Sequence, residues 1–462
     1  MTIVNSVLEL IGNTPILKLS KFDTGLCDLF IKMESENPGG SIKDRIAVCM
    51  IEAAEAEGKI KPGGTIIEAT AGNTGLGLGL VAAQKGYKLI LVIPDKMSPD
   101  KIRHIRALGV DVRLTRSDVQ KGHPEYYQDY AKRLAAEIPD SYFIDQFSNP
   151  NNPKTHRVDT GPEILRQMDG KLDAMVVGVG SSGTVTGLGQ FFHETLPHCE
   201  MVVADPEGSI LADTINTGIT PQAGSWLVEG IGEDFMPPIC DISLVKKAYA
   251  ISDREAFQTQ RQLLLREGII AGSSTGTLLS AALRYCREQT EPKRVLTFAC
   301  DTGNKYLSKL FNDFWMEDQG FTQRKRHDDL RDLIGRPHGE RATVTVGPED
   351  VLTTAHNRLR NAGFSQLPVM DGDTLVGFID EDDIMRLAFG DPERFIDPVR
   401  TAMHTNYLVV DKAMNLRNLV AMLDVQPYAA VMNGEIFLGL VTRADVLNYL
   451  RRQMTARTAS AA

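Results

Sequence analysis

Short runs of β-branched and apolar residues alternate with longer amphipathic segments along the first 320 residues. Apolar runs of this length, separated by helical patterns, are typical of a parallel sheet covered by helices on both faces. The sequence therefore predicts an α/β fold for this part. We expect strands at 29–34, 65–69, 88–93, 110–114, 174–177 and 201–204, and helices that include 46–56 and 76–84.

The last third of the chain contains an internal repeat. Residues 369–384 align without a gap on residues 431–446. Asp371-Gly372 and Asn433-Gly434 fall at equivalent positions and are typical of tight hairpin turns. Each repeat has the pattern strand, helix, strand, strand, helix, and we expect the two to pack together because neither can bury its apolar face alone.

The charged stretch 321–340 has few apolar residues, so we expect it to be a partly helical linker. This places one domain at 1–320 and a second, built from the two repeats, at 341–455.

Composition narrows the class of protein. The formal net charge of −10 provides no basic surface for nucleic acid or an anionic membrane. The chain shows neither a signal-peptide pattern nor an apolar run long enough to span a bilayer. The six cysteines are scattered without a Cys-x-x-Cys pair, which favours buried thiols in a reducing cytoplasm.

Lys43 lies where an extended run passes through Asn37-Pro38-Gly39-Gly40-Ser41-Ile42 into a helix. Such turns bind anions and expose reactive groups in α/β proteins. A lysine kept dry at this place can form a Schiff base. Considered alone, the turn fits a surface lysine better than a reactive one.

Two glycine-rich loops, 70–75 and 178–184, each follow an apolar strand and precede a helix. Backbone N–H groups and hydroxyls at a helix N-terminus suit carboxylate or phosphate. The second loop lacks the Gly-Lys-Ser/Thr of a Walker loop, and no acidic ribose partner stands at the spacing of a dinucleotide site. Together with these loops, Lys43 is better interpreted as a Schiff-base lysine.

These motifs, in this order, resemble those of the fold-type II enzymes that use pyridoxal phosphate. The resemblance begins at Ile11-Gly12-Asn13-Thr14-Pro15 and runs to about Leu310. It implies two parallel-sheet α/β subdomains, pyridoxal 5'-phosphate as cofactor and Lys43 as the catalytic, cofactor-binding lysine. It also implies cofactor contacts from Asn73 to the ring hydroxyl, from Thr302 to the pyridine nitrogen, and to the phosphate from Gly180, Ser181, Ser182, Gly183 and Thr184.

The same resemblance implies where the substrates bind. The substrate carboxylate would contact Thr70, Ala71, Gly72, Thr74 and Gln146, and Gly230 belongs to a rim segment, 229–237, that faces the second substrate. The chain departs from the family at three positions. Ala71 replaces a serine and so removes one hydrogen bond. Ser182 replaces a common glycine, which is tolerable if its φ is negative. Glu233 replaces an aromatic residue.

The two repeats resemble tandem CBS domains, which form a regulatory (Bateman) module. Gly439-Leu440-Val441-Thr442-Arg443-Ala444-Asp445 matches their nucleotide motif, so Thr442 and Asp445 would bind an adenosine-type ligand. Asp380 stands at the hydroxyl position of the first repeat, where its carboxylate would repel a phosphate. The alternative is a module that only holds protomers together.

A fold-type II domain followed by two CBS domains is the layout of the cystathionine β-synthase family. It implies β-replacement of L-serine, or an activated serine, by L-homocysteine to give L-cystathionine through the Lys43 Schiff base and an aminoacrylate. The alternatives are a cysteine synthase that uses O-acetylserine and sulfide, a serine or threonine dehydratase, and a nucleotide sensor without catalysis. We expect a homodimer or higher homo-oligomer, and no haem, because the chain has no N-terminal extension that could carry the haem site of animal enzymes.

Overall fold

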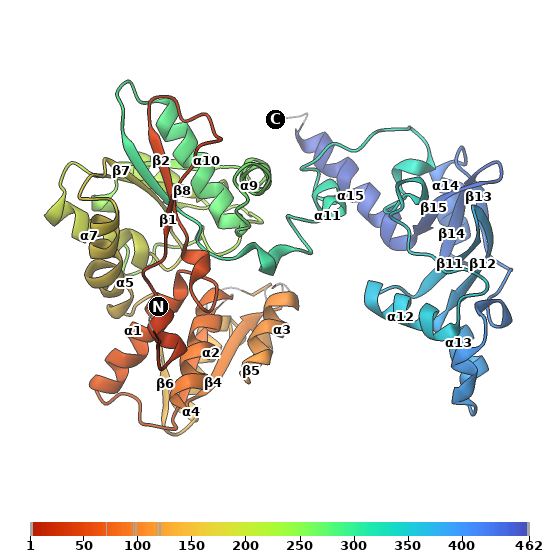
Figure 1. Cartoon of the computed structure of the whole chain (residues 1–462), viewed down its shortest axis with the longest axis horizontal. Coiled ribbons are helices and arrows are strands. Elements are labelled where there is room, and N and C mark those ends of the chain that lie inside the picture. Colours follow the sequence, from red (N-terminus) through yellow and green to blue (C-terminus); the bar gives the residue numbers. More distant parts are fainter. Residues whose placement is uncertain are drawn as a thin grey trace. The chain divides into compact units, whose positions relative to one another are not determined.

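The computed structural model describes residues 3–70, 72–95, 97, 99–116, 118–119 and 122–459. The chain divides into two compact units, Met1–Phe311 and Asn312–Ala462. The first contains two sheets and the second contains the repeats (Figure 1).

The larger sheet of the first unit has the strand order β1-β2-β10-β7-β8-β9. Its strands run parallel except β1, which pairs antiparallel with β2. Helix α10 packs on this sheet and on α9, the helix that precedes it in the chain. The elements are β1 (Ile16–Lys18), β2 (Asp28–Lys32), α5 (Asn151–Thr155), α6 (Gly161–Gln167), β7 (Ala174–Gly178), α7 (Gly183–Thr195), β8 (Glu200–Pro206), α8 (Leu211–Thr217), β9 (Lys247–Ile251), α9 (Asp253–Glu267), α10 (Ser273–Arg287) and β10 (Arg294–Phe298).

The smaller sheet has the order β5-β4-β3-β6, and all its strands are parallel. Side chains alternate between its faces, so neighbours on β3 enter different cores. Ile66 packs with α1 and α2, and Ile67 packs with α4. The elements are α1 (Lys43–Ala56), β3 (Thr65–Ala69), α2 (Asn73–Lys85), β4 (Lys88–Pro94), α3 (Pro99–Ala107), β5 (Asp111–Thr115), α4 (Tyr127–Glu137) and β6 (Ser141–Phe143).

The α/β expectation for this unit is confirmed. Strand β3 has the expected bounds, and helix α1 begins at Lys43, three residues earlier than expected. The apolar pattern of the sequence marks only the part of α1 that lies in the core, at Ile46, Met50 and Ile51. The first turn of the helix faces the site described below, so this pattern does not mark it.

The second unit consists of the two repeats and the segment before them. Both hairpins have the same register and the same irregularity, between Val369 and Met370 in one and between Val431 and Met432 in the other. The segment 321–340 is folded onto the second repeat, where Leu330 joins its core. The elements are α11 (Asp313–Asp318), α12 (Leu352–Ala362), β11 (Gln366–Asp371), β12 (Thr374–Asp380), α13 (Glu381–Ala388), β13 (Val409–Asp411), α14 (Leu416–Leu423), β14 (Tyr428–Asn433), β15 (Ile436–Thr442) and α15 (Arg443–Ala459).

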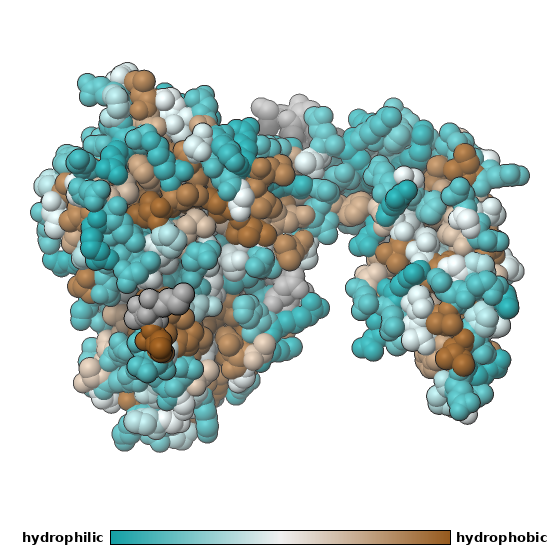
Figure 2. Space-filling model, in the orientation of Figure 1, coloured by the Kyte–Doolittle hydropathy of each residue, from teal (hydrophilic) through white to brown (hydrophobic). Residues whose placement is uncertain are grey.

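Among the described residues, no helix combines the length and apolar character needed to cross a membrane. The face drawn in Figure 2 carries its apolar side chains in separate groups among hydrophilic ones.

Candidate active site

A cavity of about 860 Å³ lies at the carboxyl ends of β3, β4, β7 and β10. Helices α2, α7 and α10 begin at its wall, and none of the three has a side chain capping its first turn. The first N–H groups of a helix have no partner within the helix. Three uncapped helix starts therefore offer N–H groups and partial positive charge to anionic groups of a ligand.

Lys43, the first residue of α1, lines this cavity. Its amine has no hydrogen-bond partner within the described part of the chain. Burial lowers the pKa of this amine, against the opposing effect of acidic neighbours that include Asp301 and Glu233. A lowered pKa increases the neutral fraction of the amine, the form that acts as nucleophile and base.

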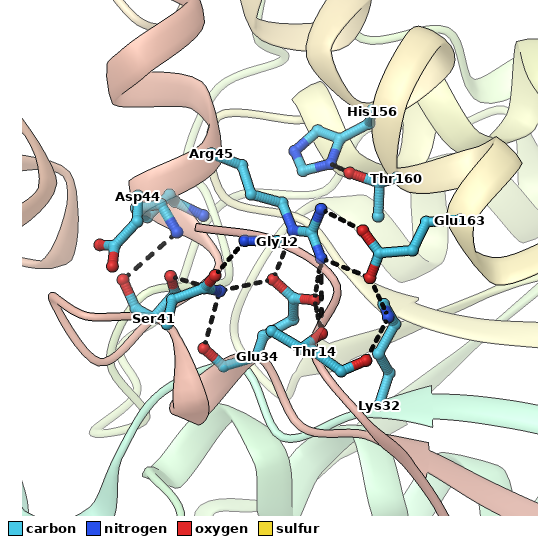
Figure 3. Close-up of polar contacts among 12 residues, drawn as sticks. Gly12, Thr14, Lys32, Glu34, Ser41, Asp44, Arg45, His156, Thr160 and Glu163 are labelled. Carbon is cyan, nitrogen blue, oxygen red and sulfur yellow. Dashed lines mark hydrogen bonds and ion pairs between the residues drawn. The ribbon is translucent and has the colours of Figure 1, made fainter. Parts of the chain in front are cut away.

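A buried ionic network holds the turn that carries Lys43 (Figure 3). The guanidinium of Arg45 lies between two carboxylates, 2.8 Å from Glu34 and 2.9 Å from Glu163. Glu163 also accepts from the ammonium of Lys32 at 2.5 Å, and Thr14 donates to Glu34 at 2.6 Å. Loss of one partner of a buried ion pair costs about 3–5 kcal/mol because the other charge is left unpaired. The network thus fixes α1 to the strand before it and to α6.

The predicted phosphate loop, Gly180 to Thr184, lines the cavity throughout its length. Two of its glycines are sterically required. A Cβ on Gly180 would lie 2.6 Å from the carbonyl oxygen of Gly230, and a Cβ on Gly183 would lie 1.8 Å from Oδ1 of Asn152. Thr184 contacts Nε2 of the buried His156 at 3.3 Å, and burial keeps the pKa of that imidazole far below its usual range.

Ser182 does not meet the condition set from the sequence. Its φ is +67°, in the left-handed region, because it precedes the first residue of α7 at the sharp turn from β7. This conformation costs a non-glycine residue about 1–2 kcal/mol. The Ser182 hydroxyl offsets part of the cost by donating to the carbonyl of Ser181 at 2.6 Å.

The predicted carboxylate-binding residues Thr70, Gly72, Thr74 and Gln146 also line the cavity, whereas Ala71 lies outside the described residues. Thr74 donates to Oε1 of Gln146 at 2.8 Å, and Nε2 of Gln146 donates to Glu68 at 3.3 Å. Burial raises the pKa of Glu68 to about 8. This chain of contacts sets the orientation of the Gln146 amide.

Asn73 and Gly230 lie in the cavity wall as expected. The Asn73 amide donates to Asp301 at 2.8 Å and accepts from the ammonium of Lys305 at 2.9 Å. Asp301 follows β10, so this pair joins the two sheets of the first unit across the site.

The position of Thr302 differs from the sequence prediction. This residue is not among the residues that line the cavity, and its hydroxyl accepts from the N–H of Asn304, at the start of a short 3-10 helix. The hydroxyl on this wall is Ser274, in the first turn of α10, which also hydrogen-bonds to Cys300. The sequence signal for this wall is the glycine- and hydroxyl-rich run Gly272-Ser273-Ser274-Thr275-Gly276.

A cluster of charged side chains that the sequence did not predict lies at the rim of the cavity. Glu229 accepts from Lys101, on α3, and from Lys309, and Lys101 also donates to the hydroxyl of Tyr306 at 3.1 Å. Burial alone would raise the pKa of Glu229, but the two ammonium groups lower it overall. No local pattern predicts this cluster, because its members are brought together only by the fold.

In the second unit, Thr442 and Asp445 lie together. The hydroxyl of Thr442 donates to Asp445 at 2.6 Å, and the Thr442 N–H donates to the same oxygen at 2.8 Å. Asp380 and Asp383 form the equivalent reciprocal cap in the first repeat. Asp383 further contacts His404 at 2.7 Å. The first repeat therefore presents two carboxylates where the second presents a hydroxyl and a carboxylate.

Comparison with known proteins agrees with this geometry. A model of pyridoxal-phosphate-dependent enzymes matches residues 7–301, and a model of the CBS domain matches residues 340–390. The chain is 36% identical to the mouse cystathionine beta-synthase, over 94% of this chain and 78% of the mouse protein. A cysteine synthase of Staphylococcus aureus is 39% identical but covers 67% of this chain and 98% of its own.

A solved structure of an O-acetylserine-dependent cystathionine beta-synthase from Helicobacter pylori is 37% identical, with a TM-score of 0.61, and covers 67% of this chain and 99% of its own. The chain therefore belongs to the pyridoxal-phosphate-dependent enzymes and, within them, to the cystathionine β-synthases, because the mouse relative matches both units and the cysteine synthase matches about two thirds of the chain. The enzyme is a lyase that uses pyridoxal phosphate, as the motifs predicted.

The residues present fit this cofactor. Gly180 and Gly183 let the loop backbone pack directly against Gly230 and Asn152, and the uncapped start of α7 supplies N–H groups for a phosphate. Lys43 lies in the same cavity with a free amine, and Ser274 presents a neutral hydroxyl on the wall formed by α10.

Proposed function

We propose that this enzyme condenses L-serine, or a serine activated at its hydroxyl, with L-homocysteine to give L-cystathionine. The observation that carries the proposal is the convergence, in one cavity, of Lys43 and the uncapped starts of α2 and α7. Similarity to the mouse enzyme along nearly the whole chain supports this substrate pair over that of a cysteine synthase.

Each part of the cavity has a role in this reaction. Bound pyridoxal phosphate withdraws electrons from the α-carbon of an attached amino acid and so acidifies its proton. The loop from Gly180 to Thr184 would hold the phosphate, and Ser274, which lines the cavity, would hydrogen-bond to the pyridine nitrogen in place of Thr302. The loop at Gly72, with Thr74 and Gln146, holds the substrate carboxylate. Lys43 secures the cofactor and, once released by the incoming amino acid, its neutral amine accepts the α-proton.

A matrix of four assays tests the proposal. Purified holoenzyme is given serine or O-acetylserine, each with homocysteine or with sulfide, and the product is quantified. We expect cystathionine from homocysteine at a higher kcat/KM than cysteine from sulfide. The reverse order with O-acetylserine would instead establish a cysteine synthase, the alternative that the Staphylococcus aureus relative favours.

We also propose that the second unit binds an adenosine-type ligand at Thr442 and Asp445. Burial raises the pKa of Asp445, and its carboxylate lies beside the backbone of Gly335, so a ligand here would meet a preformed polar corner. The carboxylate of Asp380, which stands where the second repeat has the Thr442 hydroxyl, disfavours a phosphate at the equivalent corner.

Titration calorimetry with AMP, ATP and S-adenosylmethionine is the test of this regulatory site. We expect one ligand to bind at one site per chain, and Asp445→Ala to weaken it by at least about 10-fold, the size of a lost charge-assisted hydrogen bond. Asp373→Ala, at an exposed hairpin tip, is the control. Absence of heat with all three ligands would leave the module as an assembly device.

Two further parts of the proposal concern the oligomeric state of the enzyme and its cellular location. We propose a homodimer or higher homo-oligomer, which sedimentation of the purified chain measures. All six cysteines are unpaired, which supports a reducing compartment such as the cytoplasm.

A further inference from the structure

Glu233 is an ionisable residue of the cavity that has no role in the reaction as described above. It lies on the rim segment and lines the cavity together with Lys43. Its carboxyl has no hydrogen-bond partner among the residues that the structure describes. Glu34 and Glu163, which hold the turn before Lys43, are paired with cations, whereas the Glu233 carboxyl in the substrate cavity is not, which points to a role in binding or catalysis.

The backbone at Glu233 is held firmly. Its N–H donates to Oγ of Ser209 at 3.0 Å, and its carbonyl accepts from the N–H of Ile210 at 3.1 Å and from Oγ of Ser209 at 3.2 Å. The preceding residue, Gly232, has a φ of +86° and donates to the carbonyl of Val179 at 2.8 Å. A fixed backbone below an unpaired side chain is the arrangement expected of a group that meets substrate.

The groups around Glu233 favour its protonated form. Burial raises the pKa of this carboxyl well above its usual range, and Asp234 on the same segment and Asp205 at the end of β8 raise it further, whereas Lys43 lowers it. Tyr127, the first residue of α4, and Tyr126 just before it lie within its electrostatic range, and the pKa of each phenol is raised by burial. The cavity thus contains a carboxyl group whose surroundings favour the form that can donate a proton.

Serine needs such a donor, whereas O-acetylserine does not. Loss of the serine hydroxyl without a proton would release hydroxide, a strong base and therefore a poor leaving group. Acetate leaves as a carboxylate, whose acid resembles an aspartate side chain with a pKa of about 3.9. Lys43 is committed to the α-proton, so the proton for the leaving oxygen has to come from another group.

We propose that Glu233 is the acid–base group at the β-carbon of the donor amino acid, and that it gives the enzyme its capacity to use unactivated serine. This inference rests on the proposed function. Glu233 donates its proton to the hydroxyl oxygen as the Cβ–O bond breaks, and water leaves. The resulting carboxylate then takes the proton of the homocysteine thiol as the S–Cβ bond forms, which returns Glu233 to its starting state. Lys43 returns its proton to the α-carbon of the product, so serine and homocysteine give cystathionine and water with no net change in protons.

The test compares the two donors in wild-type holoenzyme, Glu233→Gln and the control Glu207→Gln, an exposed carboxyl that is outside the cavity. We expect Glu233→Gln to lower kcat/KM for serine by about 10²–10⁴-fold, the usual contribution of a general acid. The loss with O-acetylserine should be at least about 10-fold smaller, because only the thiol step needs Glu233 with that donor. Cofactor absorbance and the melting temperature establish that the variant is folded and loaded.

The pH profile gives a readout that a structural role would not change. In wild type, kcat/KM for serine should fall as the pH rises through the raised pKa of Glu233, since the acid form is then lost. This limb should be absent with O-acetylserine and in Glu233→Gln. Equal losses with both donors, a similar loss in Glu207→Gln, or a wild type inactive with serine would each overturn the proposal.

A second arm separates this proposal from the choice of thiol substrate. Pyruvate released from serine, or from O-acetylserine, without any thiol reports loss of the β-substituent alone. A wild type that forms pyruvate but no cystathionine would refute the proposed function. In that case a selective loss of pyruvate formation from serine in Glu233→Gln would still support the donor role, and an unchanged rate would refute it.

Discussion

Lys43→Ala should leave a folded protein that has lost nearly all turnover. Lost proton transfer alone lowers the rate by about 10²–10⁴-fold, and the loss of the covalent hold on the cofactor adds to this. The fold should persist because the Lys43 amine makes no hydrogen bond within the described residues, and the ionic network that fixes α1 depends on Arg45 instead.

Two measurements examine this result. Steady-state assays with both donors report turnover, and absorbance of the purified protein reports whether the cofactor is linked to a lysine. The control is Lys59→Ala, an exposed lysine that pairs only with the exposed Glu57. Turnover within 10-fold of wild type in Lys43→Ala, a margin of about 1.4 kcal/mol in the barrier, would exclude Lys43 as the catalytic lysine.

Local signals were sufficient where a function depends on a turn. The run before Lys43 and the loops at Gly72 and Gly183 combine glycines with a strand before and a helix after, and each lies where that pattern places it. Such motifs can be recognised in a sequence because they depend on local backbone geometry rather than on contacts with distant side chains.

The sequence was insufficient where a function depends on which hydroxyl faces the cavity. Thr302 follows the carboxyl end of β10, and Ser274 lies in the first turn of α10. Both side chains are neutral hydroxyls, so the sequence alone does not distinguish them. Thr302 turns its hydroxyl to cap Asn304, whereas Ser274 lies in the uncapped first turn of α10 and faces the cavity. Such local capping competes with ligand contacts and is decided by the tertiary structure.

Charge pairs between residues far apart in the sequence could not be predicted either. Glu34 and Arg45 are close in sequence, but Glu163 and Lys32 join them from distant elements, as Lys101 joins Glu229. Glu233 was recognised from the sequence as a departure, yet its role could be inferred only once its unpaired carboxyl was located in the same cavity as Lys43.

Gly183→Ala should be the most damaging small substitution in the phosphate loop. The added Cβ would lie 1.8 Å from Oδ1 and 2.4 Å from Cγ of Asn152. Asn152 cannot retreat cheaply, because its amide donates to the carbonyl of Gln146 at 2.8 Å and to Oγ of Ser181 at 2.9 Å. Overpacking of this kind costs about 1–3 kcal/mol, and the breaking of either hydrogen bond adds about 1 kcal/mol.

The same displacement should weaken cofactor binding, because Asn152 connects the phosphate loop to the segment that carries Gln146. We expect the dissociation constant for pyridoxal phosphate to rise by at least about 10-fold, equivalent to 1.4 kcal/mol, with a parallel fall in the melting temperature of the apoenzyme. Cofactor titration followed by absorbance and thermal unfolding measure the two effects. Gly339→Ala, where the added Cβ has no neighbour within 4 Å, is the control and should change neither. Wild-type affinity in Gly183→Ala would mean that the phosphate is held elsewhere in the cavity.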